Sequence, residues 1–98
     1  MIVNVPGEGM PELNDIDNFQ SFCISTSCGL DRLAEALSPI GRLEPDGHAW
    51  ISRDWLFQNG RPDDSAWRAG FQSMLIVAER SHWIDNSGFI RAHVEFSI

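Results

Sequence analysis

IRAHVEFSI, residues 90–98, has the clearest structural pattern in the chain. Every second residue in it is apolar, and the residues between are charged or polar. Because side chains alternate between the two faces of a β-strand, this pattern predicts a sheet with one buried face and one wet face. The buried row would consist of Ile90, Ala92, Val94, Phe96 and Ile98.

The segment before this strand supplies a helix on which the buried row could pack. Apolar residues recur at helical spacing within residues 63–82, and Pro62 suits the first helical turn. Ile76 and Val77 widen the apolar stripe, so we expect the helix to be buried on more than one side. The predicted contact joins Ile90, Val94 and Phe96 of the strand to Trp67, Phe71 and Met74 of the helix.

The rest of the chain divides at its turn signals. Pro45-Asp46-Gly47 and residues 85–88 are typical turns, and Ser27 and Ser52 are suitable helix N-caps. Residues 1–18 are rich in Gly, Pro and acid, and indicate a loop-rich arm with a short strand at Ile2–Val5. The other predicted elements are a strand at 19–26, a helix at 28–38, a hairpin of 42–44 with 48–51, a helix at 53–58, and a short strand around Trp83.

These elements predict one α+β domain spanning residues 1–98. We expect a mostly antiparallel sheet with two main helices packed on one face, in the order β-α-β-β-α-α-β-β.

Charge and composition limit the classes of partner. The chain has 14 acidic and 7 basic residues, a net charge of -7. Such a surface repels phosphate backbones and anionic lipids, so we expect no nucleic acid or membrane partner, and instead a basic protein or a small molecule. The absence of a signal peptide and of a long apolar run indicates a cytoplasmic protein.

The wet face of the last strand contains the first candidate site. Arg91, His93 and Glu95 point to the same side, and a histidine between a cation and a carboxylate is a candidate acid-base group. No nucleophile in the sequence is tied to this face, so a solvated strand face is the competing interpretation.

The cysteines and histidines give no recognisable metal site. Cys23 and Cys28 are spaced as C-x4-C, and together with His48, His82 and His93 they match no standard ligand pattern. Cys28 lies in a predicted first helical turn, which favours a thiolate, but no base accompanies it. Phosphate-binding and metalloprotease motifs are also absent. We therefore expect neither a metal nor a cofactor.

Four tryptophans and no tyrosine make an aromatic pocket or an interface a candidate. Trp67 fits a core position in the long helix. Trp50 and Trp55 flank a turn into a short helix, where partial exposure is expected. With Arg53 nearby, they are the predicted ligand-binding or partner-binding residues.

A helix-turn-helix with a wing is an alternative for residues 53–94. The second helix begins with Asp63 and Asp64, which would face phosphate, and only Arg61 and Arg68 oppose them. The charge therefore argues against this alternative.

The C-terminal third resembles small uncharacterised bacterial proteins of the kind carried on mobile, integron-type gene cassettes. The residues behind this resemblance are Trp67, Gly70, Phe71, Met74, Ala78, Trp83-Ile84-Asp85 and residues 90–95. The resemblance implies no activity, cofactor or catalytic residue.

From these observations we expect a non-catalytic binding module for a protein partner or a small cationic or aromatic ligand. Alternatives are a winged-helix-like nucleic-acid-binding regulator and a small enzyme that uses His93 and Glu95. We also expect a homodimer if the last strand lies at a sheet edge and pairs with its copy.

Overall fold

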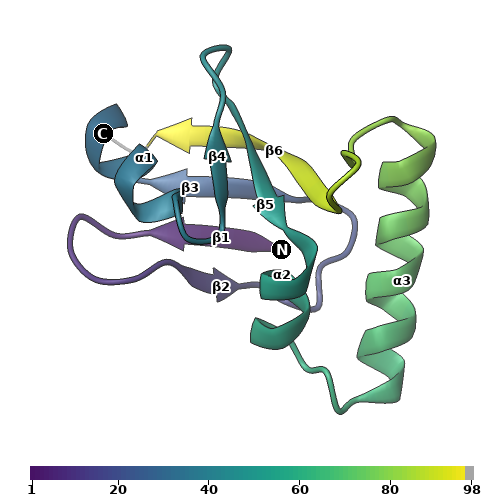
Figure 1. Ribbon diagram of the computed structural model, residues 1–98. Coiled ribbons are helices and arrows are strands. Elements are labelled where there is room, and N and C mark those ends of the chain that lie inside the picture. Colours follow the sequence, from purple (N-terminus) through teal and green to yellow (C-terminus); the bar gives the residue numbers. More distant parts are fainter. Residues whose placement is uncertain (97–98) are drawn as a thin grey trace.

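The structure is a computed structural model that describes residues 1–96. Within these residues it contains six strands and three helices, which confirms the predicted α+β fold (Figure 1). In chain order the elements are β1 (Ile2–Val5), β2 (Glu12–Asn14), β3 (Cys23–Thr26), α1 (Leu30–Leu37), β4 (Gly41–Leu43), β5 (His48–Ser52), α2 (Arg53–Asn59), α3 (Ser65–Arg80) and β6 (Phe89–Phe96).

The strands form one mixed sheet in the spatial order β2-β1-β3-β6-β5-β4. β1 runs parallel to β3 and β3 runs parallel to β6, whereas the other neighbouring pairs are antiparallel. The predicted mostly antiparallel sheet is thus corrected to a mixed sheet, with the element order β-β-β-α-β-β-α-α-β. Side-chain alternation reports which face of a strand is buried and not the direction of its neighbour, so the sequence pattern could not make this distinction.

The N-terminal segment confirms the predicted strand at Ile2–Val5 but is not a separate arm. Val3 and Val5 are fully buried, and β1 lies between β2 and β3 inside the sheet. The expected Gly- and Pro-rich loop follows β1. Arg32 of α1 fixes this loop, because its Nε and Nη2 atoms donate to the carbonyls of Gly7 (3.2 Å) and Gly9 (2.6 Å). The segment is therefore part of the core and of the sheet.

The last strand confirms the predicted alternation over most of its length. Ile90, Ala92 and Val94 are buried, whereas Phe96 is 48% exposed; the expectation for Ile98 lies outside the described residues. β6 pairs with β3 on one side and β5 on the other. The expected pairing of this strand with its copy at a sheet edge is therefore wrong, since the edge strands of the described sheet are β2 and β4.

Local signals place most helix and turn boundaries correctly. Ser52 caps α2 by accepting a hydrogen bond from the Trp55 amide. The predicted hairpin is formed by β4 and β5, with Gly47 at a φ of 88° in its turn. The N-cap of α1 is Gly29 and not Ser27, and it makes no side-chain bond. The predicted short strand at Trp83 is reduced to a single bridge between Ile84 and Ile90.

The third helix lies at one end of the sheet, next to the start of β6, and does not lie flat across a face (Figure 1). Its buried residues are Trp67, Phe71, Leu75 and Ala78. Trp67 stacks on Phe71 with ring centroids 5.0 Å apart. Against expectation, Ile76 and Val77 are exposed, so the helix is buried on one side only. Of the residues in the predicted contact, Ile90, Val94, Trp67 and Phe71 belong to one apolar core, and Met74 packs against it. The expected burial of Phe96 is wrong, because this residue is 48% exposed at the opposite end of β6.

The covered face of the sheet and the buried sides of all three helices form one apolar core. Paired strand residues such as Val3, Ile24 and Val94 lie in one row on this face. None of the helices in residues 1–96 combines the length and the apolarity needed to cross a membrane.

Candidate functional site

The uncovered face of the sheet brings three chemically active side chains into one row. His93 on β6 lies opposite His48 on β5 and opposite Cys23 on β3. The two imidazole rings meet edge to face, with centroids 5.7 Å apart. Because directly paired residues point to the same face, all three side chains lie on the side away from the core.

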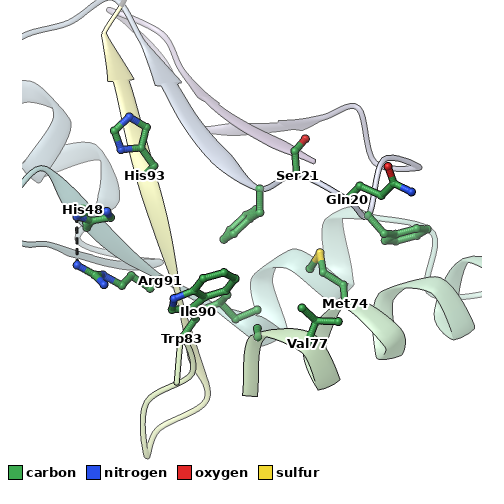
Figure 2. Close-up of a pocket in the computed structure, with 12 residues that line it drawn as sticks. Gln20, Ser21, His48, Met74, Val77, Trp83, Ile90, Arg91 and His93 are labelled. Carbon is green, nitrogen blue, oxygen red and sulfur yellow. Dashed lines mark hydrogen bonds between the residues drawn. The ribbon is translucent and has the colours of Figure 1, made fainter. Parts of the chain in front are cut away.

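A cavity of about 670 Å³ lies beside this row, between the sheet and the C-terminal half of α3. Figure 2 shows His48, Arg91 and His93 on one side of it and Met74 and Val77 on the other, with Trp83 between them. The volume is within the usual range of small-molecule sites, roughly 300–1,000 Å³. Its apolar lining comes from Phe19, Phe22, Met74, Val77, Ala78, Trp83 and Ile90; its polar lining comes from Gln20, Ser21, His48, Arg91 and His93.

Trp83 is fixed by its backbone while its indole stays in contact with solvent. The Trp83 amide donates to the Ala78 carbonyl (2.8 Å), and the Trp83 carbonyl accepts from the Arg91 amide (2.8 Å). The preceding residue, His82, has a φ of 61°, which turns the chain sharply after α3. Trp83 itself is nevertheless 47% exposed. The fold therefore fixes the backbone of a large, partly exposed aromatic residue beside the cavity.

The segment before β3 forms another wall of the cavity. The α-ammonium group of Met1 donates to the carbonyls of Asn18 (2.7 Å) and Ser21 (2.8 Å) and holds this segment against the sheet. The ring of Phe19 lies where a side chain at Gly70 would stand. Glycine at this position therefore lets the Phe19 ring pack directly on the α3 backbone.

The polar side of the cavity is organised around Arg91. Its Nη2 atom lies 3.0 Å from Oδ2 of Asp46 and 3.3 Å from Nδ1 of His48. The hydrogen bond from the His48 amide to Asp46 (3.1 Å) and the nearby His48 and Arg91 side chains lower the pKa of the Asp46 carboxyl. Asp46 is therefore ionised at neutral pH and neutralises part of the charge of Arg91.

The structure brings only two of the three residues of the first predicted site, Arg91, His93 and Glu95, to the cavity. Arg91 and His93 border the cavity, whereas Glu95 is exposed and does not line it. Glu95 instead affects Cys23: burial first, and then the negative charge of Glu95, raise the pKa of the Cys23 thiol. A raised pKa disfavours the thiolate, which is the nucleophilic form of cysteine.

The predicted aromatic site is not assembled into one pocket. Trp50 lies on the uncovered face beneath Arg42, whose guanidinium carbon is 5.0 Å from the ring centroid, and its Nε1 atom donates to Glu44. Trp55 packs against the core from α2, and Arg53 is exposed beside Gly88. The cation-π partner of Trp50 is therefore Arg42, and none of the three predicted residues lines the cavity.

Sequence analysis missed Trp83, Phe22 and Val77 as members of a shared site. One feature of the sequence pointed to this site. The apolar stripe on α3 is wider than the single side of a helix that packs on a core. Val77 is 57% exposed next to this cavity. Of the two exposed apolar residues that widen this stripe, Val77 borders the cavity and Ile76 does not.

The structure also places the residues of the possible metal and nucleic-acid sites. No three His, Cys, Asp or Glu side chains among residues 1–96 are arranged to hold a metal ion. Cys23 and Cys28 are both free thiols, and the Cys28 sulfur lies 2.8 Å from the Thr26 hydroxyl.

At the junction of α2 and α3, Arg61 pairs with Asp17 (2.6 Å) and Arg68 donates to the Pro62 carbonyl (2.9 Å). The two cations that the helix-turn-helix alternative would need thus have partners within the chain.

The chain was compared with protein-family models, with curated proteins and with solved structures. No family model matches it, and neither a curated protein nor a solved structure shows significant similarity to it.

Proposed function

We propose that this protein is a non-catalytic binding module for a small aromatic ligand, which lies against Trp83 in the cavity between the sheet and α3. The half-exposed Trp83 indole, fixed beside Phe22, Met74 and Val77, is the observation that supports this most directly. Aromatic side chains provide large contact areas and prefer offset or edge-to-face contacts with other rings. A flat apolar molecule matches these walls.

The surrounding side chains suit an aromatic ligand better than a cationic one. Met74 contributes a flexible, polarisable side chain that adapts to ring edges. Arg91 and two histidines form the polar side, so a cation in the cavity would lie beside a guanidinium. Of the two ligand classes expected from the sequence, we therefore propose the aromatic one and not the cationic one.

A non-catalytic role is supported by what surrounds His93. Glu95, its expected carboxylate partner, lies outside the cavity lining, and the pKa of the neighbouring Cys23 thiol is raised. Nucleophilic catalysis by cysteine requires the opposite shift and an adjacent base. The polar groups of the cavity are better suited to hydrogen bonding with a ligand.

The direct test is calorimetric titration with naphthamide, a neutral aromatic probe. We expect saturable binding, and we expect Trp83→Ala to weaken it at least about tenfold, because burying an aromatic side chain is worth about 1.5–3 kcal/mol. Leu30→Ala is the matched control, since Leu30 is also an exposed apolar residue but lies on α1, outside the cavity. Equal binding by Trp83→Ala and wild type, or no saturable binding by wild type, would contradict the proposal.

A further inference from the structure

An ion pair between Arg91 and Asp46 lies at the polar side of the cavity, and only one of its two members lines the cavity. Arg91 on β6 lines the cavity, whereas Asp46 reaches Arg91 from the turn of the β4–β5 hairpin and does not line the cavity. We propose that the ligand of this site has a carboxylate that binds Arg91, and that the neighbouring Asp46 carboxylate, which holds one Arg91 donor, weakens this binding by charge repulsion. This inference rests on the proposed function and adds the chemical class of the ligand.

Arg91 has unused capacity for an anion. Its Nη2 atom contacts Asp46 and His48, while its Nε and Nη1 atoms make no hydrogen bond with the part of the chain that the structure describes. A guanidinium presents its N–H groups as a planar fork that matches the two oxygens of a carboxylate. Binding a ligand carboxylate in this way would fill donors that the Asp46 contact leaves free.

The Asp46 contact is weak enough to be exchanged. The side chains of Arg91 and Asp46 are 35% and 55% exposed, and ion pairs at such exposure contribute little to stability. Asp46 is also positioned independently of Arg91, because its Oδ1 atom accepts the His48 amide within the turn. The carboxylate of Asp46 therefore stays near Arg91 whether or not a ligand is present, and competes with an incoming anion.

Two other carboxylates on this face have partners of their own, and Glu95 lies outside the cavity lining. Glu44 accepts a hydrogen bond from the Trp50 indole, and Asp85 pairs with Arg42 at 2.9 Å. The imidazoles of His48 and His93 add polar groups beside Arg91. Arg91 and the two imidazoles are thus a group of cationic and neutral side chains on a protein with a net negative charge. Such a local departure from the overall charge is expected for a site that selects an anion.

The test compares naphthoate with naphthamide, which share a ring system but differ in charge. By calorimetry we expect wild type to bind naphthoate more tightly than naphthamide. Asp46→Asn keeps an oxygen for the His48 amide and removes the competing charge, so naphthoate should bind about threefold more tightly. Arg91→Gln should weaken naphthoate binding at least about tenfold and change naphthamide binding less than about twofold.

The control for overall charge is Glu35→Gln, because it removes one negative charge from the exposed surface of α1, away from the cavity. Thermal unfolding monitored by circular dichroism verifies that each variant is folded. Equal affinity of wild type for the two probes, or the same gain in Glu35→Gln as in Asp46→Asn, would overturn this inference while the proposed function stands. Failure of both probes to bind wild type would overturn the proposed function, and this inference with it.

Discussion

The indole nitrogen of Trp67 donates a hydrogen bond of 2.9 Å to the backbone carbonyl of Ile16, which is 51 residues earlier in the chain. The same ring stacks on Phe71 and contacts Phe57 at 6.1 Å between centroids. Trp67 therefore joins the segment between β2 and β3 to α3 and to α2. Because α3 lies at the end of the sheet, this connection helps to fix the wall of the candidate site.

Replacing Trp67 separates its two contributions to stability. Trp67→Phe keeps an aromatic ring but removes the donor to Ile16, so we expect a loss of about 1 kcal/mol in the free energy of unfolding. Trp67→Ala also removes the stacked ring, and a loss of about 3–5 kcal/mol is expected. Urea denaturation of the two variants measures both values. Equal losses would show that the hydrogen bond to Ile16 accounts for the whole effect.

The start of α3 depends on one of two neighbouring aspartates. Asp64 is the N-cap, and its Oδ1 atom accepts from the amides of Ala66 (2.9 Å) and Trp67 (3.1 Å). We expect Asp64→Ala to lower the free energy of unfolding by about 1 kcal/mol. Asp63→Ala is the matched control, since it removes the same charge one residue away and no cap, and its effect should be within about 0.5 kcal/mol. A loss of the same size in both variants would mean that helix-dipole charge, not capping, stabilises this end.

Gly41 is required by a close approach of backbone between β4 and β5. A Cβ atom at this position would overlap the carbonyl oxygen of Trp50, whereas a Cβ atom at Gly7 would meet nothing within 4 Å. Since backbone cannot move aside as a side chain can, we expect Gly41→Ala to destabilise the fold by about 2 kcal/mol. Gly7→Ala should be close to neutral in the same thermal or chemical unfolding experiment. A fully stable Gly41→Ala variant would show that the hairpin shifts without cost.

Acid should weaken the turn before β6. Burial raises the pKa of Asp85, but hydrogen bonds from the Phe89 amide, Arg42 and the Ser87 amide outweigh it, and the net pKa lies below its ordinary value of 3.8. A carboxyl with a lowered folded-state pKa stabilises the fold above its unfolded-state pKa, and this contribution is lost as the pH falls through the folded-state pKa.

The corresponding measurement is the free energy of unfolding of wild type and Asp85→Asn from about pH 6 down to about pH 2. Wild type should be the more stable at the upper end, and the difference should shrink below about pH 4. Asparagine keeps an oxygen for the two amides, so the variant reports mainly the charge. A difference that is constant over the whole range would contradict this assignment.

Much of the fold could be predicted from local patterns. The alternation at Ile90, Ala92 and Val94 reports a strand with one buried face because that pattern is a property of the strand itself. The hairpin turn at Asp46-Gly47 and the cap at Ser52 follow from single side chains acting on nearby backbone. These features needed no knowledge of distant residues.

The remaining features depend on residues that are far apart in the chain. β1 becomes an inner strand only because β2 and β3 pair with it, and its parallel direction relative to β3 leaves no mark on the side-chain pattern. The cavity unites the segment before β3, the end of α3 and the uncovered face of β6, so Trp83 could not be distinguished from Trp50 or Trp55 by sequence position. The burial tendency of each residue and the positions of the turns can be predicted from the chain alone, since both are short-range properties. Which aromatic side chains stay exposed beside Arg91 and His93 depends on the assembled fold, because it follows from which surfaces the sheet and helices have already covered.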